Sequence, residues 1–171
     1  MANIITIYFS MKGQTIGPGM KLTHLDKGNT AVAAEFIQKA VGGDLFEIEA
    51  DRAYSEDHMV LIKEAKQELE NGTRVPAKFY PDLSRYDTVY LGYPNWWNTM
   101  PMVLFTFLEH YDWTGKRIIP FCTNEGSGLG NSVSDIKKLC PDAEVDEGAS
   151  FTGSQVRESE GKIAGWAKSR L

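Results

Sequence analysis

The chain has 171 residues, 42% of them hydrophobic, which is enough for one well-buried core and too few for two ordinary domains. Its formal net charge of -5 at pH 7 provides no basic field to hold a phosphate backbone, which argues against nucleic acid or an anionic membrane as a partner. The apolar run near the N-terminus is too short for a signal sequence or a membrane span, and we expect a cytoplasmic protein.

The first half of the chain alternates between strand-like and helix-like patterns. Residues 4–9 form a nearly continuous apolar and β-branched run, typical of a strand buried on both faces of a parallel sheet. Residues 31–41 carry apolar side chains at helical spacing and are followed by Gly42 and Gly43, which predict the end of a helix. Residues 45–50 alternate like an edge strand, and residues 55–71 carry the apolar stripe of a second helix.

The second half continues the alternation. It predicts strands at 88–93, 117–122 and 145–151, and helices at 102–108, 131–140 and 163–171. Strands that alternate with helices predict an α/β fold with a doubly wound parallel sheet and helices on both faces, here in a single domain over 1–171. Pro120 lies inside a predicted central strand, where it removes a hydrogen-bond donor, and the sequence offers no explanation for it.

No set of residues predicts metal binding or hydrolytic catalysis. Cys122 and Cys140 are far apart, without a CxxC pattern or a histidine at metal-ligand spacing, so we expect neither a disulfide nor a metal site. The three histidines form no Ser/His/Asp or Cys/His arrangement, and the P-loop motif is absent. We therefore assign no catalytic residue.

The loop after the first predicted strand contains two candidates for a phosphate-binding segment. Ser10 follows that strand, and the candidates are Lys12-Gly13-Gln14-Thr15 and Lys27-Gly28-Asn29-Thr30. Only the second leads directly into a helix, where backbone N–H groups can hold an anion. We therefore assign Ser10, Asn29 and Thr30 to the anion and interpret residues 11–27 as an insertion. In the alternative interpretation, Asn29 or Thr30 is an ordinary helix N-cap.

Two further loops follow the strands at 88–93 and 117–122. The first, Pro94 to Thr99, contains two adjacent tryptophans that Pro94 and Asn95 exclude from the sheet, and the second, Thr123 to Gly130, contains three glycines in five residues. The alternatives are that the tryptophans belong to the core and that the glycine-rich segment is a mobile surface loop. Because ligands of open α/β sheets bind beyond the carboxyl ends of the strands, the three loops together predict a phosphorylated planar heterocycle such as FMN.

These segments resemble a known family. Tyr8-Phe9-Ser10 with Gly28-Asn29-Thr30 is similar to the phosphate loop of flavodoxin-like proteins, and residues 93–101 and 120–128 resemble the two flavin-ring loops of a short-chain bacterial subgroup. The resemblance implies a five-stranded sheet in the order 2-1-3-4-5 and non-covalent FMN. The residues expected at the cofactor are Ser10, Gly28, Asn29, Thr30 and Ala31, then Pro94, Asn95, Trp96, Trp97, Asn98 and Thr99, and finally Thr123, Asn124, Glu125, Gly126, Ser127 and Gly128.

Within that set we expect Trp97 to stack on or flank the flavin and Trp96 to turn inward, although the sequence also allows the reverse. The resemblance implies an electron-transfer protein that passes electrons between redox partner proteins. The alternative is an FMN-dependent NAD(P)H oxidoreductase acting on quinones or another small electron acceptor, in which the insertion at 11–27 shapes a substrate pocket or the contact of a homodimer. A third possibility is a binding module that kept the fold and lost the flavin.

Overall fold

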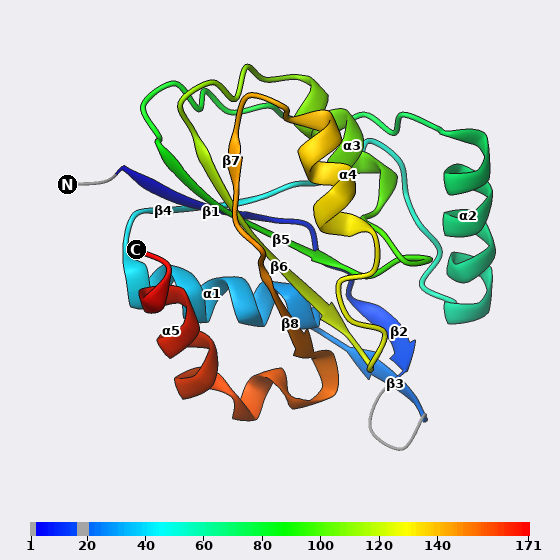
Figure 1. The fold of residues 1–171 in the computed structure, drawn as a ribbon. Helices are drawn as coiled ribbons and strands as arrows, with labels where there is room; N and C mark the ends of the chain where they lie inside the picture. Colours follow the sequence, from blue (N-terminus) through cyan, green and yellow to red (C-terminus); the bar gives the residue numbers. More distant parts are fainter. Residues whose placement is uncertain (1–2, 17–20) are drawn as a thin grey trace.

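Six strands form one parallel sheet in the computed structural model, which describes residues 3–16 and 21–171 (Figure 1). The strands are β1 (Ile4–Tyr8), β4 (Asp44–Glu47), β5 (Thr88–Pro94), β6 (Arg117–Asn124), β7 (Glu144–Val145) and β8 (Ala149–Thr152). Their order is β4-β1-β5-β6-β7, with β8 also paired to β6. The expected order 2-1-3-4-5 is present, and the expected fifth strand at 145–151 is divided into β7 and β8.

Pro120 lies in β6, opposite the break between β7 and β8, the two short strands that pair with β6 at the edge of the sheet. β7 pairs with β6 at Arg117 and Ile118, whereas β8 pairs with it from Phe121 onward. The carbonyl oxygen of Pro120 faces Gly148, where an added Cβ would be 2.8 Å from it. Because the N–H and C=O positions of one residue point to the same side of a strand, the missing N–H of Pro120 faces the gap between β7 and β8, where β6 has no strand partner.

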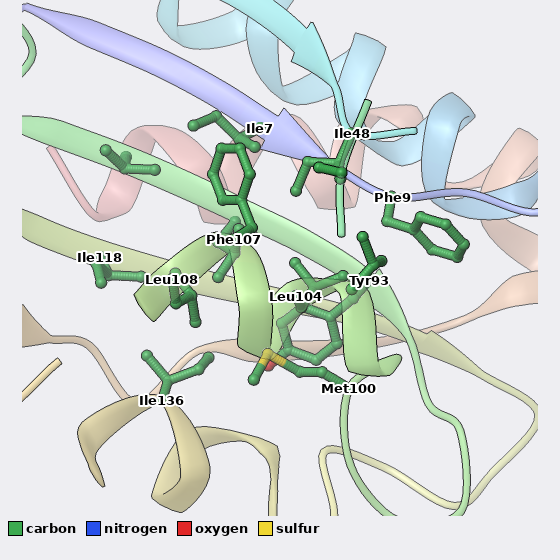
Figure 2. Close-up of a cluster of buried hydrophobic side chains, with 14 of the residues drawn as sticks. Ile7, Phe9, Ile48, Tyr93, Met100, Leu104, Phe107, Leu108, Ile118 and Ile136 are labelled. Atoms are coloured by element: carbon green, nitrogen blue, oxygen red, sulfur yellow. The ribbon is translucent and has the colours of Figure 1, made fainter. Parts of the chain in front are cut away.

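Helices cover both faces of the sheet (Figure 1). On one face, α1 (Asn29–Val41) and α5 (Glu160–Ser169) enclose a core with Tyr90, Phe121 and Phe151. On the other, α3 (Met102–Glu109) and α4 (Ser132–Leu139) pack on a larger core. Figure 2 shows this larger core, in which Phe107, Leu104 and Met100 meet Tyr93 and the strand residues Ile7 and Ile118.

The helix α2 (His58–Asn71) carries the predicted apolar stripe, but of that stripe only Ala65 is buried. It begins three residues later than predicted, because the side chain of Asp57 accepts a hydrogen bond from Val60 N (3.1 Å) and caps it. Met59, part of the predicted stripe, is 60% exposed, and within α2 only Ala65 and Glu68 are buried. In Figure 1, α2 lies beside the sheet rather than over one of its faces.

The segment predicted as an insertion, 11–27, contains an antiparallel hairpin of β2 (Gly13–Ile16) and β3 (Leu22–Leu25). Residues 17–20 of this segment lie outside the described residues, and its role as an insertion stays a prediction. A 3-10 helix that the sequence reasoning missed, η2 (Gly153–Glu158), connects β8 to α5. Among the helices that the structure describes, none combines the length and the apolar composition needed to cross a bilayer.

Candidate functional site

A cavity of about 340 Å³ lies at the carboxyl ends of β1, β5 and β6. The predicted residues that line it come from all three loops: Asn29, Thr30, Pro94, Asn95, Trp96, Trp97, Thr123, Asn124, Glu125 and Ser127. The parallel strands end at this edge, which explains why loops so distant in the sequence meet. Of the remaining predicted residues, Ser10, Gly28 and Ala31 line a neighbouring cavity, and Asn98, Thr99, Gly126 and Gly128 line neither of the two.

The start of α1 is capped from another segment. Gly28 is the N-cap residue and has no side chain to offer, while the Oγ of Ser10 accepts a hydrogen bond from Ala31 N (3.0 Å). The alternative in which Asn29 or Thr30 is the N-cap is therefore wrong, since both lie within the helix. A Cβ on Gly28 would lie 2.2 Å from the Oγ of Ser10, so this close approach requires glycine.

The loops after β1 and β6 are joined by a buried hydrogen bond. The hydroxyl oxygens of Thr30 and Thr123 lie 2.7 Å apart, and both side chains belong to residues that are almost fully buried. One hydroxyl donates to the other, which leaves a second O–H group able to donate to a ligand. The start of α1 and the end of β6 thus have a fixed relative position at the cavity.

The two tryptophans have different surroundings. Trp96 is partly buried and packs edge-on against Phe9 (5.6 Å between ring centroids) and Tyr54 (5.1 Å), so it turns inward as expected. Trp97 is 44% exposed, and its Nε1 donates to the carbonyl of Ile62 on α2 (2.9 Å). Both line the cavity, and stacking of Trp97 on a flavin stays a prediction.

The turn at Trp97 and Asn98 has a strained backbone, with φ of 54° and 76° at these two residues. Asn95 stabilises it, because its Oδ1 accepts from Asn98 N (2.9 Å) while its Nδ2 donates to Gly128 O (2.8 Å). The carbonyl of Asn98 in turn accepts from Asn131 N (2.7 Å). Asn95 therefore connects the second loop to the third.

The glycine-rich loop is organised by its own side chains. The Oδ1 of Asn124 accepts hydrogen bonds from Gly126 N (2.9 Å) and Gly128 N (3.0 Å), so these two N–H groups are directed into the loop rather than into the cavity. The carboxylate of Glu125 accepts from the N–H and the hydroxyl of Ser154 at the start of η2 (both 3.1 Å). Any backbone N–H group that this loop offers to a ligand therefore belongs to a residue other than Gly126 and Gly128.

One wall of the cavity was missed by the sequence reasoning. It is formed by Met11, Leu25 and Gly153, and by four residues of α2, namely His58, Leu61, Ile62 and Ala65. The signal was present in the apolar stripe of the helix predicted at 55–71, to which we assigned no part in a binding site. The sequence does not distinguish an apolar face that covers a core from one that covers a cavity.

A charged cluster holds α2 in this position. Arg52 pairs with Glu64 and Glu68, and the hydroxyl of Tyr54 donates to Glu68 (2.7 Å). Burial, together with the bond to Glu68, raises the pKa of Tyr54 above its usual range, so its hydroxyl keeps the proton that it donates. The ring of Tyr54 also contacts Trp96, so this cluster links α2 to the tryptophan loop.

Cys122 lies near the end of β6, beside the third loop, and is free and buried. Burial raises the pKa of its thiol to about 12. A thiol of this kind stays protonated and unreactive near neutral pH, so Cys122 acts as a small hydrophobic residue.

Comparisons with known proteins agree with this architecture. Among curated protein sequences there is no match. A protein of Bacteroides eggerthii described as a candidate flavoprotein is 31% identical, with a TM-score of 0.72 over 96% of this chain and 99% of the other. A second candidate flavoprotein, from Bacteroides uniformis, is 26% identical, with a TM-score of 0.75 over 98% of each chain.

A flavoprotein of Lactobacillus acidophilus, solved in complex with FMN, shares the fold at 16% identity, with a TM-score of 0.60 over 92% of this chain and 98% of the other. The family described as flavodoxin matches residues 3–169. This match covers nearly the whole sequence, so the chain belongs to the flavodoxin family.

Proposed function

We propose that this protein binds FMN non-covalently in the cavity at the carboxyl ends of β1, β5 and β6 and passes electrons between redox partners. The observation that carries the proposal is the convergence of three loops, from distant parts of the sequence, on one cavity of about 340 Å³. The FMN complex of the Lactobacillus acidophilus flavoprotein, which shares the fold, supports the choice of cofactor. Family membership supports redox chemistry.

The residues at the α1 end of the cavity fit a phosphate group. The first turn of α1 directs backbone N–H groups and the positive end of the helix dipole to this place. Thr30 adds a hydroxyl and Asn29 an amide, both without charge. Gly153 lines the same end, where a Cβ would lie 2.6 Å from the Nδ2 of Asn29, so the absence of a side chain keeps this end open.

Other residues of the cavity lining fit a flat, mostly apolar ring. Trp97 and Pro94 supply flat surfaces, and Leu61, Ile62 and Ala65 supply an apolar wall on α2. The flavin supplies one-electron and two-electron chemistry when bound. Trp97 and the third loop would hold the ring, and the apolar wall on α2 would exclude water from it.

Redox partners of an electron carrier dock on the protein surface near its cofactor. The net charge of -5 favours partners with a basic docking surface, because complementary charge speeds the encounter of the two proteins. We include this class of partner in the proposal.

The second candidate function is an FMN-dependent NAD(P)H oxidoreductase acting on a quinone or another small acceptor. The wall that α2 forms beside the cavity favours it, since an apolar enclosure suits a small planar molecule better than a protein partner. Steady-state oxidation of NAD(P)H with a quinone separates the two functions. An electron carrier without its partner proteins consumes almost no NAD(P)H, whereas an oxidoreductase oxidises NAD(P)H continuously while the quinone lasts.

The first experiment is the visible absorption spectrum of the purified protein before and after incubation with FMN, with identification of any chromophore that heat releases. We expect a yellow protein that releases FMN. Trp97→Ala should weaken FMN binding by about fivefold or more, because it removes a ring contact worth about 1 kcal/mol. Phe79→Ala, which removes an exposed ring outside the cavity, should leave binding unchanged. A colourless protein that FMN cannot reconstitute would reject both functions.

A further inference from the structure

The 3-10 helix η2 places one arginine on the segment that begins α1. Val156 anchors η2, because its side chain is fully buried in the core on the α1 face, together with Ala34 and Ile37 of α1. The next residue, Arg157, is exposed and extends along the surface to the segment 27–29. The position of Arg157 relative to α1 is therefore set by a packed core residue beside it.

The guanidinium group of Arg157 bridges the two residues on either side of the helix cap. Its Nη2 donates to the carbonyl of Lys27 (2.6 Å), and its Nη1 donates to the Oδ1 of Asn29 (2.6 Å). Because a guanidinium group can only donate, the atom of Asn29 that faces it must be the oxygen. The NH₂ group of Asn29 is then the one directed to Gly153, and both of these residues line the cavity.

Arg157 also brings a positive charge to this end of the cavity. Within the described part of the chain, no carboxylate pairs with Arg157, whereas the nearby Lys27 is paired with Glu35 (2.8 Å). The residues assigned above to the phosphate, Asn29 and Thr30, carry no charge. The guanidinium group is thus the unpaired cation in direct contact with the residues of the proposed phosphate site.

From this arrangement we infer that Arg157 is a positioning residue that makes the cavity select a phosphorylated flavin over its unphosphorylated form. The inference rests on the proposed function and deepens it. Arg157 acts through Asn29, because its bond to the Oδ1 fixes the orientation of the amide and leaves the NH₂ group free to donate to the phosphate. It also acts through its charge, which attracts a group carrying between one and two negative charges near neutral pH. Riboflavin has the same ring and no phosphate, so its binding does not depend on Arg157.

The test is to measure the dissociation constants of FMN and riboflavin by quenching of flavin fluorescence, for the wild type and for Arg157→Gln, Arg157→Lys and Arg74→Gln. We expect Arg157→Gln to weaken FMN binding by about tenfold and riboflavin binding by less than about twofold. Arg157→Lys keeps the charge and should retain most of the preference, and it serves as the test if Arg157→Gln does not fold. Arg74→Gln changes the net charge equally at an exposed site outside the cavity and should behave as the wild type.

The pH dependence gives a readout that a merely structural role would not move. The preference of the wild type for FMN should decline as the pH falls through about 6, where the phosphate dianion takes up one proton and becomes a monoanion, and this decline should be smaller in Arg157→Gln. If Arg157→Gln weakens both flavins equally, or neither, or if the wild type binds both flavins equally, the inference is overturned while flavin binding stands. If the wild type binds neither flavin, the proposed function is wrong and the inference falls with it.

Discussion

Replacement of Cys122 by alanine should remove a part of the protein's stability that depends on pH. The thiol lies in β6, fully buried, with its sulfur 3.8 Å from the carbonyl oxygen of Gly128 in the third loop. Burial raises its pKa from 9.0 to about 12. Because the folded pKa lies above the unfolded one, the contribution of the thiol to stability is complete below pH 9.0 and is lost as the pH rises toward 12. At about pH 10.5 the unfolded thiol has ionised and the folded one has not, which lowers the free energy of unfolding by about 2 kcal/mol.

The measurement is urea unfolding of the wild type and of Cys122→Ala at about pH 8 and about pH 10.5. The variant leaves a small void whose cost is the same at both pH values, and the titration of Cys140 and of the buried tyrosines is common to both proteins. We therefore expect the wild type to lose about 2 kcal/mol more than the variant between the two conditions. Equal losses would refute the assignment of a raised thiol pKa to burial at this position.

Three further substitutions test the site. Gly28→Ala should weaken FMN binding and destabilise the fold by about 1–3 kcal/mol, because its Cβ would overlap the hydroxyl of Ser10 that caps α1. The control Gly161→Ala, at a helical position with open space, should not destabilise the fold. Titration with FMN measures the effect on binding, and urea unfolding measures the effect on stability. Thr30→Val should lower the free energy of unfolding by about 1–2 kcal/mol, because it leaves the hydroxyl of Thr123 without its buried partner. In a double-mutant cycle, Thr123→Val should cost less in the Thr30→Val background than in the wild type. Glu68→Gln should lower the melting temperature and raise the exchange rate of the α2 amides, because it weakens the charged cluster that holds α2; unchanged amide exchange would contradict this role.

The strands and the loops after them could be predicted from the sequence because each signal there is local. The apolar run of β1 and the prolines and glycines that end β5 and β6 fix which segments reach the carboxyl edge of the sheet. Pro120 shows the limit of such reasoning. Within β6 it contradicts the strand pattern, and the reason lies in the gap between β7 and β8, which only the paired sheet reveals.

The position of α2 and the role of Arg157 could not be predicted, since both depend on contacts between distant segments. The apolar stripe of α2 is the same whether it faces a core or a cavity, and a cluster around Arg52 decides between them. Arg157 is separated from Asn29 by 128 residues, and nothing in its neighbourhood in the sequence indicates a ligand. The predicted contacts of Ser10 were also incomplete, because the sequence does not show that its hydroxyl is used to cap α1.

The distribution of the two cores has a consequence for the order in which the protein can fold during synthesis. The core on the α3 and α4 face draws on residues up to Cys140 and Val145, whereas the core on the α1 face needs Phe151, Val156, Ile163 and Ala167. On the ribosome, α1 therefore stays without its cover until the residues from Phe151 to Ala167 have been made. The α1 end of the cavity, which includes Gly153, is completed at the same late stage, so a nascent chain acquires its first packed face well before it acquires a complete binding site.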